Sequence, residues 1–262
     1  MEIKHPKLIE TVRRAGEILL STHGVHSDID VKPGEANFVT AYDVAVQKFL
    51  FTELSRLYPD AAFIGEEDNE DNFTALRSGR AFVIDPIDGT TNFIKDYRMS
   101  AVSVALCEMG EPVVGAVLNP YMDELFYAER GAGAILIRDG ETVDLSVSRC
   151  GLSESVILFG TTPYEKPLHD RTFAVARTLF DHALDIRRSG SAALDLCAVA
   201  AGRGDVFFEL RLSPWDYAAG MLLVAEAGGV ITAMDGSPLR LDGRCSVLAG
   251  NPAAYAEALS LL

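Results

Sequence analysis

The amino-acid sequence predicts a layered α+β fold. Three observations lead to this prediction: amphipathic helical patterns near the N-terminus, a run of short strands between residues 101 and 137, and strands that alternate with helices after residue 147. A chain of 262 residues can bury a large core, and its content of 48% hydrophobic and 23% charged residues is ordinary for a folded protein.

Two helices are predicted before residue 60. Residues 6–21 carry an apolar face at helical spacing, made of Leu8, Val12, Ala15 and Leu19. The second helix covers residues 40–58 and ends before Pro59. Its apolar stripe consists of Val46, Leu50, Leu54 and Leu57.

A series of strands follows these helices. Residues 81–85 form a short apolar run that stops at Asp85-Pro86, which is typical of a buried strand that ends at a loop. Four more strands, separated by glycine-containing turns, are predicted at residues 101–107, 113–118, 125–128 and 134–137. Successive short strands of this kind indicate an antiparallel meander.

The second half of the chain has a different pattern. Strands are predicted at residues 156–159, 206–208 and 230–232, and helices at residues 168–180, 191–201 and 216–227. This alternation indicates an α/β lobe. We therefore expect an N-terminal α+β lobe over residues 1–147, a C-terminal α/β lobe over residues 148–262, and a functional site between them.

Charge and cysteine content exclude several classes of function. The net charge of −15 disfavours direct binding to nucleic acid, because a phosphate backbone is repelled by such a surface. No apolar run is long enough to cross a bilayer, and the N-terminus lacks the pattern of a signal peptide, which favours the cytoplasm. Four widely spaced cysteines predict reduced thiols rather than disulfides or a zinc site.

The segment from Asp85 to Phe93 carries the strongest chemical signal. A strand delivers Asp85 to its end and Asp88 follows, so that two carboxylates and the Ile87 carbonyl converge on a hard cation. Gly89 allows the backbone to approach a ligand closely. The amides of Gly89 and Thr90 then lie at a helix start, where phosphate oxygens bind. A cation beside an anion site indicates phosphoryl transfer.

This segment resembles the signature of the inositol monophosphatase family. Three further segments resemble the family in order and spacing: residues 63–67, 187–193 and 214–220, which read Phe-Ile-Gly-Glu-Glu, Arg-Arg-Ser-Gly-Ser-Ala-Ala and Pro-Trp-Asp-Tyr-Ala-Ala-Gly. The resemblance runs from near the first helix to about Gly229 and therefore covers most of the chain.

The resemblance implies roles for particular residues. The positions that match its magnesium ligands, for two or three Mg²⁺ ions with Mn²⁺ as a substitute, are Glu66, Asp85, the Ile87 carbonyl, Asp88 and Asp216. Thr90, with Asp43 beside it, and Glu66 match the residues that position the attacking water. The positions that match phosphate and substrate contacts are Ile87, Asp88, Gly89, Thr90, Gly190, Ser191, Ala192, Glu209 and Asp216.

The resemblance also implies a fold, a reaction and an assembly. The fold is the layered αβαβα sugar-phosphatase fold, shared by inositol monophosphatases and fructose-1,6-bisphosphatases. The reaction is magnesium-dependent hydrolysis of inositol-1-phosphate or a related polyol or sugar phosphate, with attack by a water whose pKa the metal lowers. A homodimer, sensitivity to lithium, and a small phosphate ester as the binding partner are implied as well.

Some alternatives stay open at this stage. Asp216 follows Ser213-Pro214 and is also placed to cap a helix, and Glu66 is also typical of a solvated acidic loop. Arg211 stands where bacterial relatives often carry glycine, so it either contacts a second phosphate, as in a fructose-1,6-bisphosphatase, or is solvated. A regulatory protein that acts through partners is the alternative from a different class.

Overall fold

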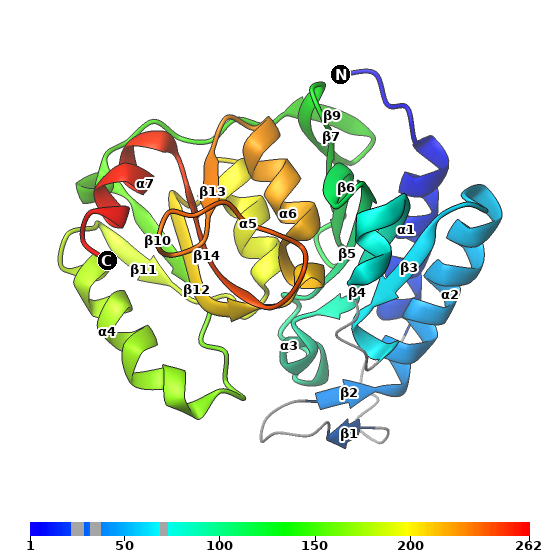
Figure 1. The fold of residues 1–262 in the computed structure, drawn as a ribbon, viewed down its shortest axis with the longest axis horizontal. Coiled ribbons are helices and arrows are strands. Elements are labelled where there is room, and N and C mark those ends of the chain that lie inside the picture. The colour runs from blue at the N-terminus through cyan, green and yellow to red at the C-terminus, as the bar shows by residue number, and fades with distance from the viewer. Residues whose placement is uncertain (22–28, 32–37, 69–72) are drawn as a thin grey trace.

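The computed structural model describes residues 1–21, 29–31, 38–68 and 73–262, and these residues form five layers (Figure 1). A seven-stranded sheet and a five-stranded sheet alternate with three layers of paired helices. This is the predicted αβαβα arrangement. A separate small hairpin is formed by β1 (Ile29–Val31) and β2 (Phe38–Thr40).

The first sheet is the predicted meander, extended at both ends. Its strands in spatial order are β3 (Ala62–Gly65), β4 (Arg80–Asp88), β5 (Ala101–Glu108), β6 (Glu111–Asn119), β7 (Glu124–Glu129), β8 (Gly133–Arg138) and β9 (Glu141–Asp144). All neighbours are antiparallel except β3 and β4. The edge strands β3 and β9 were not predicted, because both are short and β9 is fully exposed.

The second sheet is mixed. Its strands in spatial order are β11 (Asp185–Arg187), β10 (Val156–Phe159), β12 (Val206–Leu212), β14 (Cys245–Gly250) and β13 (Val230–Thr232). The strands β10, β11 and β12 are parallel, whereas β14 runs antiparallel to both of its neighbours. The sequence did not predict β11 or β14, and β12 extends beyond its predicted end.

Helices cover both sheets and fill the space between them. The outer pair on the first sheet is α1 (Pro6–Leu20) and α2 (Ala41–Leu57), and the outer pair on the second is α4 (His169–Phe180) and α7 (Pro252–Leu259). The central pair is α5 (Ala192–Ala200) and α6 (Pro214–Glu226), and a short helix α3 (Thr90–Ile94) follows β4. The described residues also contain the 3₁₀ turns η1 (Glu66–Asp68), η2 (Thr74–Ser78), η3 (Leu152–Glu154) and η4 (Lys166–Leu168).

The side chains of β4 explain why the layers stack in this way. Ala81 and Val83 face the core that contains the central helices, whereas Phe82 and Ile84 face the core under α1 and α2. Successive residues of a strand point to opposite faces, so a strand covered on both faces is apolar throughout. No helix among the described residues is both long and apolar enough to span a membrane.

Residue Pro86 does not end the strand that the sequence predicts. Strand β4 continues to Asp88, and its pairing with β5 shifts register between Asp85 and Asp88. Proline is tolerated at such a bulge because the ladder hydrogen bond is already interrupted there.

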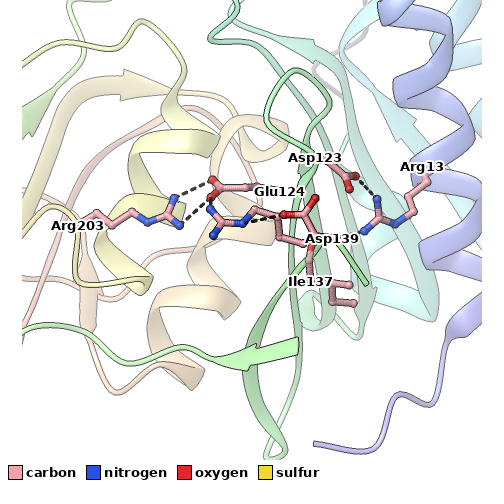
Figure 2. A network of polar contacts seen from close by, with 7 residues as sticks. Arg13, Asp123, Glu124, Ile137, Asp139 and Arg203 are labelled. Carbon is pink, nitrogen blue, oxygen red and sulfur yellow. Dashed lines mark hydrogen bonds and ion pairs between the residues drawn. The ribbon is translucent and has the colours of Figure 1, made fainter. Parts of the chain in front are cut away.

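The buried carboxylate of Glu124 pairs with two partly exposed arginines in a network that ties the central helix layer to the first sheet (Figure 2). This carboxylate is 3% exposed and accepts hydrogen bonds from both terminal nitrogens of Arg203, at 2.7 and 2.8 Å, and from Arg138 at 3.1 Å. Arg203, which follows α5, also lies over the ring of Phe126. The neighbouring Asp123 pairs with Arg13 of α1 but is exposed.

We expect Glu124→Gln to lower the free energy of unfolding by roughly 2 kcal/mol, because it removes one partner of a buried pair whose guanidinium groups retain some solvent. Arg203 holds the pKa of Glu124 below its usual value, so this contribution is complete at neutral pH and is lost as the pH falls through the folded-state pKa. Urea unfolding at pH 7 and at acid pH measures this change in the free energy of unfolding. Asp123→Asn is the matched control, with an expected loss of at most about 1 kcal/mol. Equal losses for the two variants would contradict the assigned role of Glu124.

Candidate active site

One pocket gathers nearly all of the site residues that the sequence predicts. It is formed where η1, the β4–α3 turn, the starts of α5 and α6, and β12 meet. The predicted residues that line it are Glu66, Asp85, Ile87, Asp88, Gly89, Thr90, Gly190, Ser191, Ala192, Glu209 and Asp216. The remaining predicted residue, Asp43, lies directly behind Thr90.

Three aspartates form the floor of this site. One carboxylate oxygen from each of Asp85, Asp88 and Asp216 lies within 4.8 Å of the other two. Asp85 is 1% exposed and Asp88 is 7% exposed. Buried carboxylates at this separation are stable as a group only when their charge is neutralised.

A bulge in β4 places two of these aspartates on the same side of the sheet. Residues three apart on a regular strand point to opposite faces, but the register shift between Asp85 and Asp88 changes the alternation. Gly89 then adopts φ = 85° and begins α3. A Cβ atom at Gly89 would lie 2.9 Å from the Met99 carbonyl oxygen, so only glycine fits this turn.

Each aspartate is oriented by a backbone amide. The Ile87 amide donates to Asp85 at 3.0 Å, and the Ala193 amide donates to Asp88 at 2.8 Å. The Ser213 amide donates to Asp216 at 2.7 Å, which completes a capping box at the start of α6. The capping role considered for Asp216 is therefore confirmed, and the same carboxylate also belongs to the three-aspartate cluster.

The electrostatics of the cluster favour a bound cation. Burial, followed by repulsion from Glu66, raises the pKa values of Asp85 and Asp216 well above the usual range. Burial raises the pKa of Asp88 to about 6, although hydrogen bonds from Ser191 and Ala193 oppose the shift. Within the described part of the chain, no lysine or arginine forms an ion pair with these aspartates.

The donor set fits Mg²⁺ or Mn²⁺. All candidate ligand atoms are oxygens, from three carboxylates with Glu66 and the Ile87 carbonyl in the same pocket. Hard divalent cations prefer oxygen donors, and the uncompensated negative charge supplies the attraction.

Thr90 and Asp43 meet across a wide gap in sequence. The Thr90 hydroxyl lies 3.4 Å from an Asp43 carboxylate oxygen and 3.2 Å from the Ile87 carbonyl. Asp43 is fully buried on α2, which packs on the outer face of the first sheet. A hydroxyl beside a buried carboxylate can accept a hydrogen bond from a water molecule in the pocket.

The substrate-side residues lie at the start of α5 and on β12. Ser191 caps α5 and its hydroxyl donates to Asp88. Asn92 donates to the carbonyl groups of Met99 at 2.7 Å and Ser189 at 3.0 Å, so it joins the β4–α3 turn to the segment before α5. Burial raises the pKa of Glu209 to about 7, although hydrogen bonds from Thr162 oppose this shift.

Sequence reasoning missed several residues of the site. Asp195, which is 3% exposed, and the side chains of Tyr164 and Arg188 line the pocket without having been predicted. Gln47 accepts a hydrogen bond from the Glu67 amide at 3.0 Å and thereby holds the segment that carries Glu66. Arg188 lies in the 187–193 segment that resembles the family, but the sequence analysis assigned it no role. Asp195, Tyr164 and Gln47 belong to no motif with a recognisable spacing, so only the fold reveals them.

Arg211 does not line the pocket. Its Nε atom lies 3.2 Å from a carboxylate oxygen of Glu165, and its side chain is 43% exposed. The structure therefore gives Arg211 an acidic partner outside the pocket.

Comparison with known proteins gives a consistent result. The profile of the inositol monophosphatase family matches residues 6–261. The "Nus factor SuhB" of Xylella fastidiosa is 37% identical over 93% of this chain and 88% of its own length. The "Inositol-1-monophosphatase" of Mesorhizobium japonicum is 38% identical over 93% of this chain and 90% of its own length. The crystal structure of the suppressor protein suhB from Bartonella henselae aligns with a TM-score of 0.87 and 36% identity over 97% of this chain and 96% of that one.

We expect Asp85→Asn to stabilise the metal-free protein at neutral pH by on the order of 2 kcal/mol and to remove most of the stabilisation given by Mg²⁺. Carboxyl groups with raised folded-state pKa values favour folding at acid pH, and this contribution is lost as the pH rises through those values. Melting temperatures measured between pH 4 and 8, with chelator or with Mg²⁺, report both effects.

Asp195→Asn is the matched control for this prediction. Asp195 is also buried with a raised pKa, but it lies outside the three-aspartate cluster. In Asp195→Asn, the melting temperature is expected to depend less on pH than in the unaltered protein, but still to rise when Mg²⁺ is added. If Asp85→Asn retained the full response to Mg²⁺, the metal site would be assigned wrongly.

Proposed function

The chain belongs to the inositol monophosphatase family and is a phosphatase of that type, and we propose that it is a magnesium-dependent phosphomonoesterase of inositol-1-phosphate or a related polyol or sugar phosphate. The observation that carries the proposal is the cluster of Asp85, Asp88 and Asp216, of which the first two are buried, beside the start of α3. Such a cluster suits a divalent cation, and the adjoining helix start suits a phosphate group.

The cation would be held by Glu66, Asp85, the Ile87 carbonyl, Asp88 and Asp216. When bound, the cation would lower the pKa of a water molecule at the site and place positive charge beside the phosphate oxygens. Asp43 accepts a hydrogen bond from the Thr90 hydroxyl, which leaves the oxygen lone pairs of Thr90 available as acceptors. Thr90 and Glu66 then accept hydrogen bonds from the attacking water and direct its oxygen towards phosphorus.

The phosphate group would bind at the turn between β4 and α3. The first amides of a helix have no partner within the helix, and here they belong to Gly89, Thr90 and Thr91. These donors stabilise the additional negative charge that develops on the phosphate oxygens during transfer. No nucleophilic cysteine or histidine is needed for this reaction.

The other end of the pocket favours an organic group rich in hydroxyls. Glu209 and Asp195 are buried acceptors, and Ser191 and Arg188 supply polar atoms near them. A polyol satisfies such groups, whereas an apolar alcohol leaves them unpaired. Because Arg211 pairs with Glu165, it does not favour a second phosphate in the substrate.

A regulatory role is the second candidate, and it is favoured by the relative from Xylella fastidiosa that is named a Nus factor. We propose that such a role would use the surface of the fold and not the three-aspartate cluster. As a member of this family, the chain is also proposed to form a homodimer and to lose activity in the presence of Li⁺.

We expect the purified protein to release phosphate from inositol-1-phosphate in Mg²⁺ and not in chelator. The panel should also include fructose-1,6-bisphosphate, histidinol phosphate and adenosine 3′,5′-bisphosphate. Asp85→Asn is expected to lower kcat by more than about a hundredfold, because loss of outer-shell partners alone costs about ten- to a hundredfold. Asp123→Asn, on the exposed Arg13 pair, is the control with unchanged activity. Failure to hydrolyse any member of the panel would contradict the proposal.

The regulatory candidate predicts that partner binding survives the loss of catalysis. Proteins that co-purify with the unaltered chain should co-purify equally with Asp85→Asn, because that substitution changes a buried side chain. Partners that disappear with the variant would instead link binding to the metal cluster and contradict a separate surface role.

A further inference from the structure

The chain passes directly over Glu209 as it leaves strand β10. Phe159 of β10 pairs with Phe208 of β12, and the Gly160 amide donates to the Phe208 carbonyl at 3.1 Å. The next residue of β12 is Glu209, which is 8% exposed and lines the pocket. The segment from Gly160 to Thr162 therefore decides where this carboxylate lies.

Thr162 holds one oxygen of the Glu209 carboxylate. Its backbone amide and its hydroxyl lie 2.9 and 3.0 Å from Oε1. The hydroxyl is also 3.3 Å from the Arg211 carbonyl, but its single proton favours the shorter contact with Oε1. Thr162 is 1% exposed and has φ = 42°, a conformation that β-branched residues rarely adopt. Strain of this kind is concentrated at functional sites.

Gly160 confines the other oxygen of the carboxylate. A Cβ atom at this position would lie 1.8 Å from Glu209 Oε2, so the carboxylate rests against bare backbone. Two features thus determine the orientation of Glu209. Thr162 donates two hydrogen bonds to Oε1, and Gly160, which has no side chain, leaves the space that Oε2 occupies.

The residue between these two positions contacts a second polar group of the pocket. The Thr161 hydroxyl accepts a hydrogen bond from Arg188 at 3.1 Å. Among the described residues, Arg188 is the only lysine or arginine that lines the pocket. The same three-residue segment therefore contacts both a hydrogen-bond acceptor of the pocket, Glu209, and a donor, Arg188.

We propose that Thr162 is a positioning residue for substrate selection: it fixes Glu209 as the acceptor for a hydroxyl of the organic group, so that polyhydroxylated phosphate esters are preferred over esters without hydroxyls. The inference rests on the proposed phosphatase function. A site built to accept a substrate hydroxyl discriminates strongly against analogues that lack it, because its buried acceptor then stays unpaired.

The test compares two substrates in Mg²⁺. Inositol-1-phosphate offers hydroxyls to Glu209, and p-nitrophenyl phosphate offers none. Thr162→Val removes the side-chain donor and keeps the shape, and it is expected to lower kcat/KM for inositol-1-phosphate by roughly ten- to a hundredfold, mainly through KM. Its kcat/KM for p-nitrophenyl phosphate should stay within about twofold, and Thr162→Ser should restore inositol-1-phosphate hydrolysis to within about threefold of the unaltered protein.

Two further variants make the test independent of folding defects. Gly160→Ala displaces the carboxylate without altering Thr162, and the same selective loss is expected. Thr172→Val removes another buried threonine hydroxyl, on α4, which has no hydrogen-bond partner among the described residues, and it should leave the hydrolysis of both substrates unaffected.

Equal losses for both substrates with Thr162→Val and Gly160→Ala would mean a merely structural role and would overturn the inference. Unchanged selectivity would overturn it as well. If the unaltered protein hydrolyses neither substrate, the proposed function itself fails, an outcome that is distinct from a loss of selectivity in the variants.

Discussion

The crowding of Asp85, Asp88 and Asp216 away from water is the constraint on which the rest of the site depends. Burial, then repulsion from Glu66 and among the three carboxylates, raises the pKa values of Asp85 and Asp216 and opposes folding at neutral pH unless a cation neutralises the charge. The surrounding backbone is built to hold them despite this repulsion. Each carboxylate accepts a hydrogen bond from a backbone amide. The bulge in β4 places Asp85 and Asp88 on the same side of the sheet.

The central helix pair connects this local constraint to the whole fold. Helix α5 begins beside Asp88, and helix α6 begins with the capping box of Asp216. Both helices are packed between two sheets in one continuous core. The ends of rigid elements therefore carry the charged groups, and packing of the layers determines the distances between them. The Glu124–Arg203 pair anchors the other end of α5 to the first sheet.

The two ends of the pocket use different physical means to bind a substrate. At the aspartate cluster, net negative charge and the amides of α3 favour a metal and a phosphate, with little dependence on the organic group. At Glu209, a fixed and buried acceptor requires a matching donor. This division gives a general phosphatase reaction together with a means of selecting its substrate.

The sequence by itself determined the helices with a clear apolar stripe, the meander, the family, and the residues of the nonapeptide from Asp85 to Phe93, because each of these is a local pattern of periodicity or spacing. It did not reveal the short strands β3, β9, β11 and β14, whose stability comes from their neighbours in the sheets. The resemblance placed Asp43 beside Thr90, and the tertiary structure supplies the distance of 3.4 Å between their oxygens. Only the tertiary structure decided that Gln47 supports Glu66 and that Thr162 holds Glu209. These contacts join residues about 20 to 47 positions apart, and their distances depend on how the layers pack, which no local pattern encodes.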